Sequence, residues 1–366
     1  MTCMPNYPRN KIYDEYRYRY SATEEIDSVP VRRTWIFVSR SRGIIARLAN
    51  YFSFVVTSFF KLWRLPRTDY LICESPPLFL GLTAVCMSRL KKSKLVFNVS
   101  DLWPESAEKL KIISNRFLLN LAYRLEAWIY KNAFLVSGQT RGIVQNIKTR
   151  FPSKNVVWFP NGVDLDFFEG EHENILWRKI LGISDDDFVV LYAGIIGHAQ
   201  GLDVILEAAA LLQDRCIKFL IVGDGPEKQR LEDLATKMGL RQVNFQGNLP
   251  KVKIPSLIKI CDAYIVPLKK LDLFKGAIPS KLFEPLALGK PILLGVDGEA
   301  RELFIDEGKA GLYFEPENGA ALANQIKLLF ADPNLATVLG KSGQKYVYEN
   351  FNRERIHEKF LQNLEG

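Results

Sequence analysis

The sequence predicts an α/β protein made of two doubly wound domains with parallel sheets. Its 366 residues exceed what one hydrophobic core ordinarily supports and suit two domains of common size. Short β-branched or aromatic runs alternate with amphipathic stretches, which indicates parallel strands joined by right-handed helical crossovers. The runs are almost entirely apolar, as in strands covered on both faces. With 48% hydrophobic and 25% charged residues, the composition excludes a disordered or fibrous chain.

The first half of the chain contains five expected strands and one long expected helix, Asn115–Lys131. The strands are Trp35–Val38, Tyr70–Cys73, Lys94–Val99, Phe134–Val136 and Val156–Phe159. The most apolar stretch is Ile44–Trp63. Its longest uncharged run, Leu48–Phe60, has 13 residues, against the roughly 20 that a membrane-spanning helix needs.

The second half repeats the alternation after a break. The turn sequence Pro160-Asn161-Gly162-Val163-Asp164 predicts the domain junction. The expected strands are Phe188–Tyr192, Ile217–Val222, Val243–Gln246, Ala263–Val266 and Pro291–Gly295, and the expected helices are Leu202–Leu212, Glu227–Met238 and Ala320–Phe330. We therefore predict domains over residues 1–160 and 161–345, followed by a helix over 346–366 that packs back toward the first domain.

Charge is distributed unequally between the two halves. Residues 1–150 hold 24 Lys+Arg against 11 Asp+Glu, a difference of +13, whereas residues 151–366 hold 25 and 30, a difference of −5. A basic first half favours an anionic partner such as nucleic acid, a phosphorylated lipid or a membrane, although an excess of charge can also serve solubility alone. The five cysteines include no CxxC pair, which argues against a zinc module or a disulfide scaffold.

Three loops of the second half follow expected strands and carry glycines suited to binding a phosphate. In the first, residues 194–201, glycines at a strand–helix turn let backbone N–H groups approach an anion, although such turns also serve plain packing. The second, residues 223–227, places a proline in the first helical turn and lacks the dinucleotide fingerprint. The candidate contacts in the three loops are Gly194, Ile195, Ile196, Gly197, His198, Gly223, Gly225, Gln246 and Gly247.

The fourth loop, residues 279–291, carries the most informative side chains. Ser280 is the expected N-cap of a helix, and Lys281 and Glu284 lie three residues apart on its first turn. A glutamate that accepts ribose hydroxyl hydrogen bonds, beside a lysine that faces phosphate, forms a clamp for a nucleoside diphosphate. The alternative is an ordinary surface Lys–Glu pair. The candidate contacts here are Pro279, Ser280, Lys281, Leu282 and Glu284.

In this order the four loops resemble those of glycosyltransferase family 4, and the turn at residues 161–164 matches as well. The resemblance covers nearly the whole chain. Within the family, the sequence is most similar to WbuB-like transferases of bacterial O-antigen and capsule synthesis. It implies a retaining enzyme of the GT-B fold, with two Rossmann-like domains facing across a cleft. It also implies a UDP- or GDP-sugar donor in the second domain, an acceptor mainly in the first, and no metal or other cofactor. The catalytic residues it implies are Asp101, Lys281 and Glu284.

The sequence departs from the family pattern in the donor site. Many members carry an acidic pair eight residues apart that ends at the position of Glu284, whereas here the earlier position is Gly276. The Arg and Lys of their first loop correspond to Ile195 and Gln200. Asp164-Leu165-Asp166 is similar to a metal-binding DxD, but we interpret it as the junction turn. The groups left to meet the diphosphate charge are Lys281, Lys275 and the backbone N–H groups of residues 194–197.

The first half supplies the candidate acceptor contacts. Asp101 follows a strong expected strand within residues 98–106, which resemble the DLWPES segment of the same transferases. It is the candidate for orienting the acceptor hydroxyl, and the alternative is an N-cap of the next helix. No histidine occurs in residues 1–150, so a histidine general base is excluded there. By resemblance, the leaving diphosphate takes the acceptor proton. The candidate acceptor contacts are Glu74, Ser75, Asp101, Trp103 and Glu105.

Aromatic and basic residues gather around Ile44–Trp63. The aromatic ones are Tyr51, Phe52, Phe54, Phe59, Phe60 and Trp63, and the flanking basic ones are Arg40, Arg42, Arg47, Lys61, Arg64 and Arg67. Such a helix can lie in a lipid headgroup layer, although a doubly wound domain also needs apolar core helices. We expect an anionic membrane surface that carries a polyprenyl-diphosphate-linked saccharide acceptor, and a peripheral position on the cytoplasmic face of the cell membrane. No nucleic-acid-binding module is recognisable.

The sequence begins at a segment, residues 4–8, that in the family follows a strand, a glycine-rich loop, a helix and a second strand. By resemblance we expect the first βαβ unit of the N-terminal sheet to be absent, leaving unpaired strand edges. The first function hypothesis is a hexosyl- or N-acetylhexosaminyl-transferase of surface polysaccharide synthesis. The second is a truncated, non-catalytic nucleotide-binding homologue or assembly partner. A third, a GT-B sugar-nucleotide epimerase, is disfavoured by the scarcity of histidine.

Overall fold

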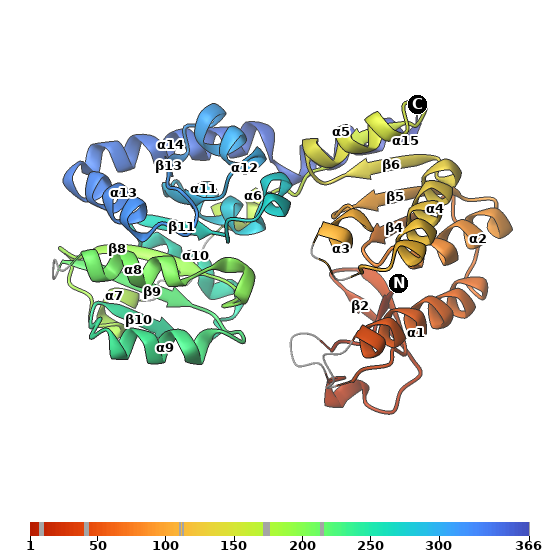
Figure 1. The fold of residues 1–366 in the computed structure, drawn as a ribbon, viewed down its shortest axis with the longest axis horizontal. Coiled ribbons are helices and arrows are strands. Elements are labelled where there is room, and N and C mark those ends of the chain that lie inside the picture. Colours follow the sequence, from red (N-terminus) through yellow and green to blue (C-terminus); the bar gives the residue numbers. More distant parts are fainter. Residues whose placement is uncertain are drawn as a thin grey trace. The chain divides into compact units, whose positions relative to one another are not determined.

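The computed structural model describes residues 1–6, 11–39, 44–109, 111, 113–170, 176–212 and 216–365. The chain divides into two compact units, Met1–Phe159 (unit 1) and Pro160–Gly366 (unit 2) (Figure 1). Each unit has its own parallel sheet, which agrees with the alternation of strands and helices in the sequence.

Unit 1 is built on a four-stranded parallel sheet with the order β4-β5-β6-β7. The strands are β4 (Tyr70–Ser75), β5 (Lys94–Val99), β6 (Leu135–Gly138) and β7 (Val156–Trp158). The helices α2 (Leu80–Lys91), α4 (Arg116–Asn132) and α5 (Arg141–Arg150) connect them. The core of the unit contains Phe97, Ile129, Tyr130 and Ile147. All four strands were predicted to within two residues at either end.

A second, smaller sheet in unit 1 has the order β1-β3-β2. Strands β2 (Ser21–Ile26) and β3 (Val29–Thr34) form an antiparallel hairpin, and β1 (Thr2–Cys3) runs parallel to β3. The strand expected over Trp35–Val38 was wrong. There the backbone of Phe37 is held by side chains instead: its N–H donates to Ser53 Oγ at 2.8 Å, and its carbonyl accepts from Asn50 Nδ2 at 2.6 Å.

Helix α1 (Ile44–Trp63), which carries Ser53 and Asn50, packs on the rest of unit 1 through one of its faces. Thr57 Oγ1 donates to the Trp35 carbonyl at 2.9 Å, and Thr83 Oγ1 of α2 donates to the Val55 carbonyl at 3.0 Å. Within the described residues, neither α1 nor any other helix has the length and apolar character needed to cross a bilayer.

Unit 2 is built on a six-stranded parallel sheet with the order β10-β9-β8-β11-β12-β13. The strands are β8 (Phe188–Ala193), β9 (Ile217–Val222), β10 (Val243–Gln246), β11 (Ala263–Pro267), β12 (Ile292–Gly295) and β13 (Gly311–Tyr313). From β8 the chain adds strands outward to β10, then returns to place β11 on the other side of β8. Ligands of doubly wound sheets bind at such a reversal, outside the carboxyl ends of the strands.

The principal helices of unit 2 are α8 (Asp203–Leu211), α9 (Lys228–Lys237), α13 (Gly319–Ala331), α14 (Pro333–Asn350) and α15 (Arg353–Glu365). Residues 346–366 do not form the single helix that was expected. The chain breaks between α14 and α15 because Phe351 is fully buried, with its ring 5.2 Å from those of Phe283 and Phe304. The packing of this segment toward the first domain stays a prediction.

Candidate functional site

Three loops are joined to one another at the carboxyl ends of β8, β9 and β10. The Ile196 N–H donates to the Asp224 carbonyl at 2.9 Å, and the Gly223 N–H donates to the Gln246 carbonyl at 3.1 Å. Gly223 has a φ of 142°, and a Cβ built on it would lie 1.9 Å from the Gly194 carbonyl oxygen. No side chain therefore fits at this position, and the loops form a rigid platform, which we call the loop platform (residues 194–197, 223–225 and 246–247).

The same contacts correct one expectation about the first loop. Two of its N–H groups, those of Gly194 and Ile196, donate to the carbonyls of Val222 and Asp224 at 2.9 Å and are not free for a ligand. In the described part of the chain, the N–H groups of Ile195 and Gly197 have no acceptor. Only these two amides of residues 194–197 are therefore available to a diphosphate.

Lys281 reaches the loop platform from the segment that follows β11. It lies in the turn η5 (Ser280–Leu282), and its Nζ donates to the Tyr192 hydroxyl at 2.7 Å. The ammonium also lies 4.3 Å from the centre of the Tyr192 ring, which is a cation–π distance. A Cβ built on Gly194 would lie 3.0 Å from Lys281 Nζ. Burial lowers the pKa of Lys281 to about 8, and the charge of Glu284 partly opposes that shift.

Glu284 follows in the first turn of α11 (Phe283–Ala287). Burial raises the pKa of its carboxyl group, and the charges of Lys251 and Lys281 lower it in part. No hydrogen-bond donor among the described residues contacts this carboxylate. A partly buried carboxylate without a protein donor is suited to accept hydrogen bonds from a ligand.

The rest of the fourth loop differs from expectation at Ser280. Helix α11 begins at Phe283, so Ser280 does not cap it, and neither η5 nor α11 has a side-chain cap. The Pro279 carbonyl accepts from the Leu282 N–H at 3.1 Å, and this tight turn replaces the predicted cap. Leu282 is fully buried and anchors the turn in the core.

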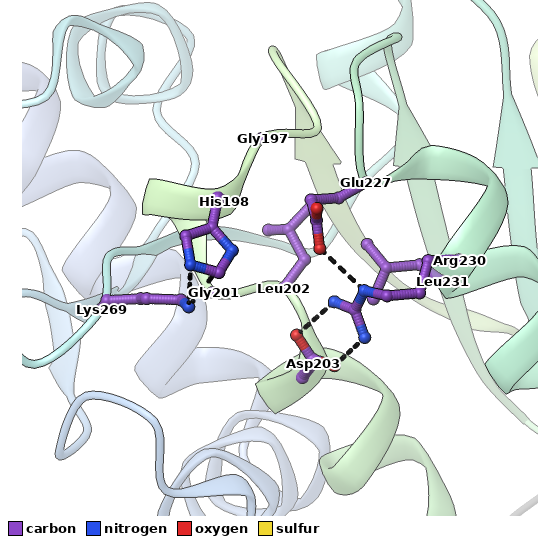
Figure 2. A pocket seen from close by; sticks show the side chains of 9 residues that line it. All are labelled: Gly197, His198, Gly201, Leu202, Asp203, Glu227, Arg230, Leu231 and Lys269. Carbon is purple, nitrogen blue, oxygen red and sulfur yellow. Dashed lines mark hydrogen bonds and ion pairs between the residues drawn. The ribbon is translucent and has the colours of Figure 1, made fainter.

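His198 lines a pocket of about 430 Å³ beside the loop platform (Figure 2). It lies in the turn η2 (His198–Gln200), and the Nζ of Lys269 lies 3.0 Å from its Nε2. At another wall, Arg230 binds both oxygens of Asp203 at 2.7 and 2.8 Å and also contacts Glu227 at 2.7 Å. The residues that line the pocket are Gly197, His198, Gly201, Leu202, Asp203, Glu227, Arg230, Leu231 and Lys269.

The remaining residues that were expected to contact the sugar-nucleotide donor are less well placed to bind it. Gln246 Nε2 donates to Asn244 Oδ1 at 2.7 Å, which holds its amide group along its own strand. Gly247 lies in open space, and a Cβ on Gly225 would lie 2.3 Å from the Ile196 carbonyl oxygen. The exposed Lys275 pairs with Asp272 at 2.7 Å.

The acceptor candidates of unit 1 lie at the carboxyl ends of β4 and β5 and just beyond them. Glu74 accepts from Asn98 Nδ2 at 2.6 Å and from Ser100 Oγ. Ser137 Oγ of β6 donates in turn to Asn98 Oδ1 at 2.6 Å. Ser75, next to Glu74, is buried. These bonds link three neighbouring strands and fix the Glu74 carboxylate.

Asp101 lies four residues before α3 (Glu105–Lys109) and accepts from Ser106 Oγ at 2.5 Å. The alternative N-cap role is wrong, since its carboxylate binds a side chain of the helix and not a backbone N–H. Glu105 is engaged by Lys109 Nζ at 2.7 Å and Asn146 Nδ2 at 3.1 Å. Trp103 packs, partly buried, against the core of unit 1.

The turn at the start of unit 2 agrees with our interpretation of Asp164 as part of the junction turn. Asp164 is the N-cap of α6 (Leu165–Glu169): its Oδ1 accepts from the Phe167 N–H at 3.1 Å. Its other oxygen pairs with Arg353 at 3.3 Å. Asp164 thus has a structural role at the junction.

Two family matches cover most of the chain. Residues 8–162 match the family Glycosyl transferase 4-like domain, and residues 173–346 match the family Glycosyl transferases group 1. The chain therefore contains a Glycosyl transferase 4-like domain followed by a Glycosyl transferases group 1 domain. It is 27% identical over 377 residues to WcaI of Escherichia coli strain K12, which is named for colanic acid biosynthesis. The alignment covers 100% of this chain and 91% of WcaI.

The two glycosyltransferase domains have the fold that the sequence predicted. The sucrose-phosphate synthase of Thermosynechococcus elongatus superposes with a TM-score of 0.74 at 18% identity, covering 100% of this chain and 88% of that one. Anabaena HepE, in complex with UDP-glucose, superposes with a TM-score of 0.69 at 19% identity, covering 88% and 84%. The prediction of the GT-B fold is confirmed.

Proposed function

We propose that this glycosyltransferase is a retaining enzyme that moves a hexosyl or N-acetylhexosaminyl group from a UDP- or GDP-sugar. The acceptor is a polyprenyl-diphosphate-linked saccharide of O-antigen or capsule synthesis. The observation that carries the proposal is the presence, in one short segment beside the loop platform, of the Lys281 ammonium and of a Glu284 carboxylate that no hydrogen-bond donor of the described residues contacts. The names of WcaI and of the HepE complex with UDP-glucose support it.

In this proposal the donor is held by unit 2 without a metal ion. Glu284 accepts hydrogen bonds from the ribose hydroxyls, while Lys281 and the N–H groups of Ile195 and Gly197, which have no acceptor among the described residues, bind the diphosphate. Negative charge grows on the diphosphate as the bond from the anomeric carbon to its oxygen breaks, so these donors stabilise the transition state more than the ground state. The leaving oxygen then takes the proton of the acceptor hydroxyl, and the hydroxyl oxygen bonds to the anomeric carbon.

The acceptor is held by unit 1. Asp101 is proposed to orient the acceptor hydroxyl. Ser106 occupies one oxygen of that carboxylate, and no hydrogen-bond donor of the described residues contacts the other. Glu74 is a second polar contact, already fixed in direction by Asn98 and Ser100. Ser75, Trp103 and Glu105 are weaker candidates, since each is buried or engaged within the protein.

The lipid-linked acceptor requires a membrane surface, and α1 is the proposed contact on the cytoplasmic face. Phe52, Val56, Phe60 and Trp63 recur at helical spacing and are 43, 53, 53 and 62% exposed. We call these four residues the α1 stripe. Of the expected basic neighbours, Arg47 and Lys61 belong to α1, Arg64 and Arg67 follow its last residue, and Arg40 and Arg42 lie outside the described residues. An apolar stripe flanked by basic residues suits an anionic headgroup layer.

A transfer assay tests the proposal. The full chain is incubated with radiolabelled UDP- and GDP-sugars and with anionic vesicles that contain a polyprenyl-diphosphate saccharide. We expect label in the lipid fraction with one donor, retention of anomeric configuration by NMR, and no product with Lys281→Met. Nucleotide binding without transfer to any acceptor would instead support the non-catalytic homologue.

A further inference from the structure

We infer that Tyr192 is a positioning residue of the donor site, whose hydroxyl holds both the Lys281 ammonium and the first loop in their ligand-binding arrangement. The inference rests on the proposed function, because it concerns the same site. It adds a residue that shows no functional signal in the sequence: Tyr192 is an apolar strand position 89 residues away from Lys281.

The Tyr192 hydroxyl stands between two groups of the site. It donates to the Ile195 carbonyl at 2.6 Å and accepts from Lys281 Nζ at 2.7 Å. A tyrosine hydroxyl has one proton and two lone pairs, so it makes both bonds at once. The residue is fully buried in β8, the strand at which the sheet reverses its order. Packing in the core therefore fixes the position of the Tyr192 hydroxyl.

The two bonds act on the groups that would meet a diphosphate. The peptide group that joins Ile195 to Ile196 is held at both ends, at its carbonyl by Tyr192 and at its N–H by Asp224. This clamp fixes the neighbouring N–H groups of Ile195 and Gly197, which have no acceptor in the described part of the chain. Loss of the hydroxyl would leave a carbonyl without its partner and release the loop.

The Tyr192 hydroxyl also affects the pH at which Lys281 loses its proton. The titratable groups around this ammonium are Tyr192 on β8 and Glu284 on α11. Glu284 in turn interacts electrostatically with Lys251, whose charge lowers the pKa of Glu284, and with Tyr264, whose pKa Glu284 raises. An oxygen that accepts from the ammonium favours its charged form. Removal of that oxygen lowers the pKa of Lys281 further, so the charge is lost at a lower pH.

The chain offers a matched control in Tyr264. This tyrosine is also fully buried, lies on the adjacent strand β11, and donates to the Ala193 carbonyl at 2.9 Å. Its removal therefore deletes a hydroxyl of the same kind from the same region. Unlike the Tyr192 hydroxyl, the Tyr264 hydroxyl makes no hydrogen bond with Lys281 or with residues 195–197 in the part of the chain that the structure describes.

The test is a calorimetric titration of UDP and GDP into the full chain from about pH 7 to pH 9, a range that spans the lowered pKa of Lys281. We expect Tyr192→Phe to weaken nucleotide affinity about tenfold near pH 7, and to move the loss of affinity at rising pH to a lower pH. Tyr264→Phe should stay within about twofold of the wild type, with an unchanged pH profile. Circular dichroism confirms that each variant is folded.

Three results would overturn the inference. A wild-type affinity and pH profile in Tyr192→Phe would remove it while leaving the proposed function intact. An equal loss in Tyr264→Phe would reduce the role of Tyr192 to general packing. Failure of the wild-type chain to bind either nucleotide at any pH would overturn the proposed function and this inference with it.

Discussion

Lys281 is the residue on which the proposed chemistry depends most. Partial burial weakens the hydration of its ammonium and lowers its pKa to about 8, while Glu284 acts in the opposite direction. The charged form therefore still dominates at neutral pH, and a bound diphosphate would favour it further. The same burial makes the interaction with an anion stronger than it would be at the surface.

The first prediction concerns pH. The affinity of the full chain for UDP or GDP should fall as the pH rises through about 8, because a lysine with a lowered pKa loses its charge there. In Lys281→Arg the guanidinium stays charged and the fall should disappear. Titration calorimetry above about pH 7, where the terminal phosphate is already ionised, measures both. An affinity of the wild type that does not change with pH contradicts this account of Lys281.

A second prediction at this scale tests the loop platform. Gly223→Ala should lower the free energy of unfolding by about 3 kcal/mol or more, since the new Cβ meets the Gly194 carbonyl oxygen at 1.9 Å at a φ of 142°. Gly247→Ala, with nothing within 4 Å of its Cβ, is the control, and should change stability by less than about 1 kcal/mol. Urea unfolding measures both. Similar stabilities for the two variants would mean that the loops are not packed as described.

The residues of the donor site differ in how readily the sequence reveals them. Lys281 and Glu284 stand in one short loop, so their spacing and the resemblance of that loop were enough to predict them as candidates. Tyr192 and Lys269 contact the site from positions 89 and 71 residues away from their partners, and no local pattern links them. Which N–H groups of residues 194–197 donate within the protein likewise depends on the neighbouring loop after β9, and the sequence does not show that the two loops are in contact.

At the scale of elements, the parallel strands were predictable because burial on both faces makes them continuous apolar runs. The hairpin of β2 and β3 was missed for two physical reasons. Its strand Ser21–Ile26 is mostly polar and exposed, and its turn uses Asp27 and Ser28 at φ 48° and 62°, without the glycine that usually marks such turns. Strand β13 has only three residues and gives no periodic signal.

The prediction at this scale concerns the α1 stripe. Trp63→Asp should weaken binding to anionic vesicles by about tenfold or more, because it removes an exposed aromatic side chain and adds a like charge. Leu361→Asp on α15, at a residue 55% exposed, carries the same charge change and should bind as the wild type. Co-sedimentation at fixed salt measures the bound fraction. If both variants bind equally, α1 is not the membrane contact.

At the scale of the whole molecule, the unequal charge gives the two units different proposed tasks. The net charge of +13 in residues 1–150 lies in the unit with the α1 stripe and the acceptor candidates. The net charge of −5 in residues 151–366 lies almost wholly in the unit with the candidate donor site. In the proposed function, a local cluster of Lys281 and the two N–H groups that have no acceptor in the described residues attracts the nucleotide to an otherwise acidic unit. The length indicated two domains, and the charge counts together with the family resemblance already predicted this division, whereas the side-chain groups that would carry each task depend on the structure.

The most direct test of the account is a calorimetric titration of UDP and GDP into the full chain and into two variants that each remove one glutamate charge. We expect Glu284→Gln to lose about 1–3 kcal/mol of binding free energy, since in the proposed function its carboxylate accepts hydrogen bonds from the ribose. Glu358→Gln on the exposed face of α15 should retain wild-type affinity. An unchanged affinity in Glu284→Gln would contradict the account, because the donor would then be held elsewhere.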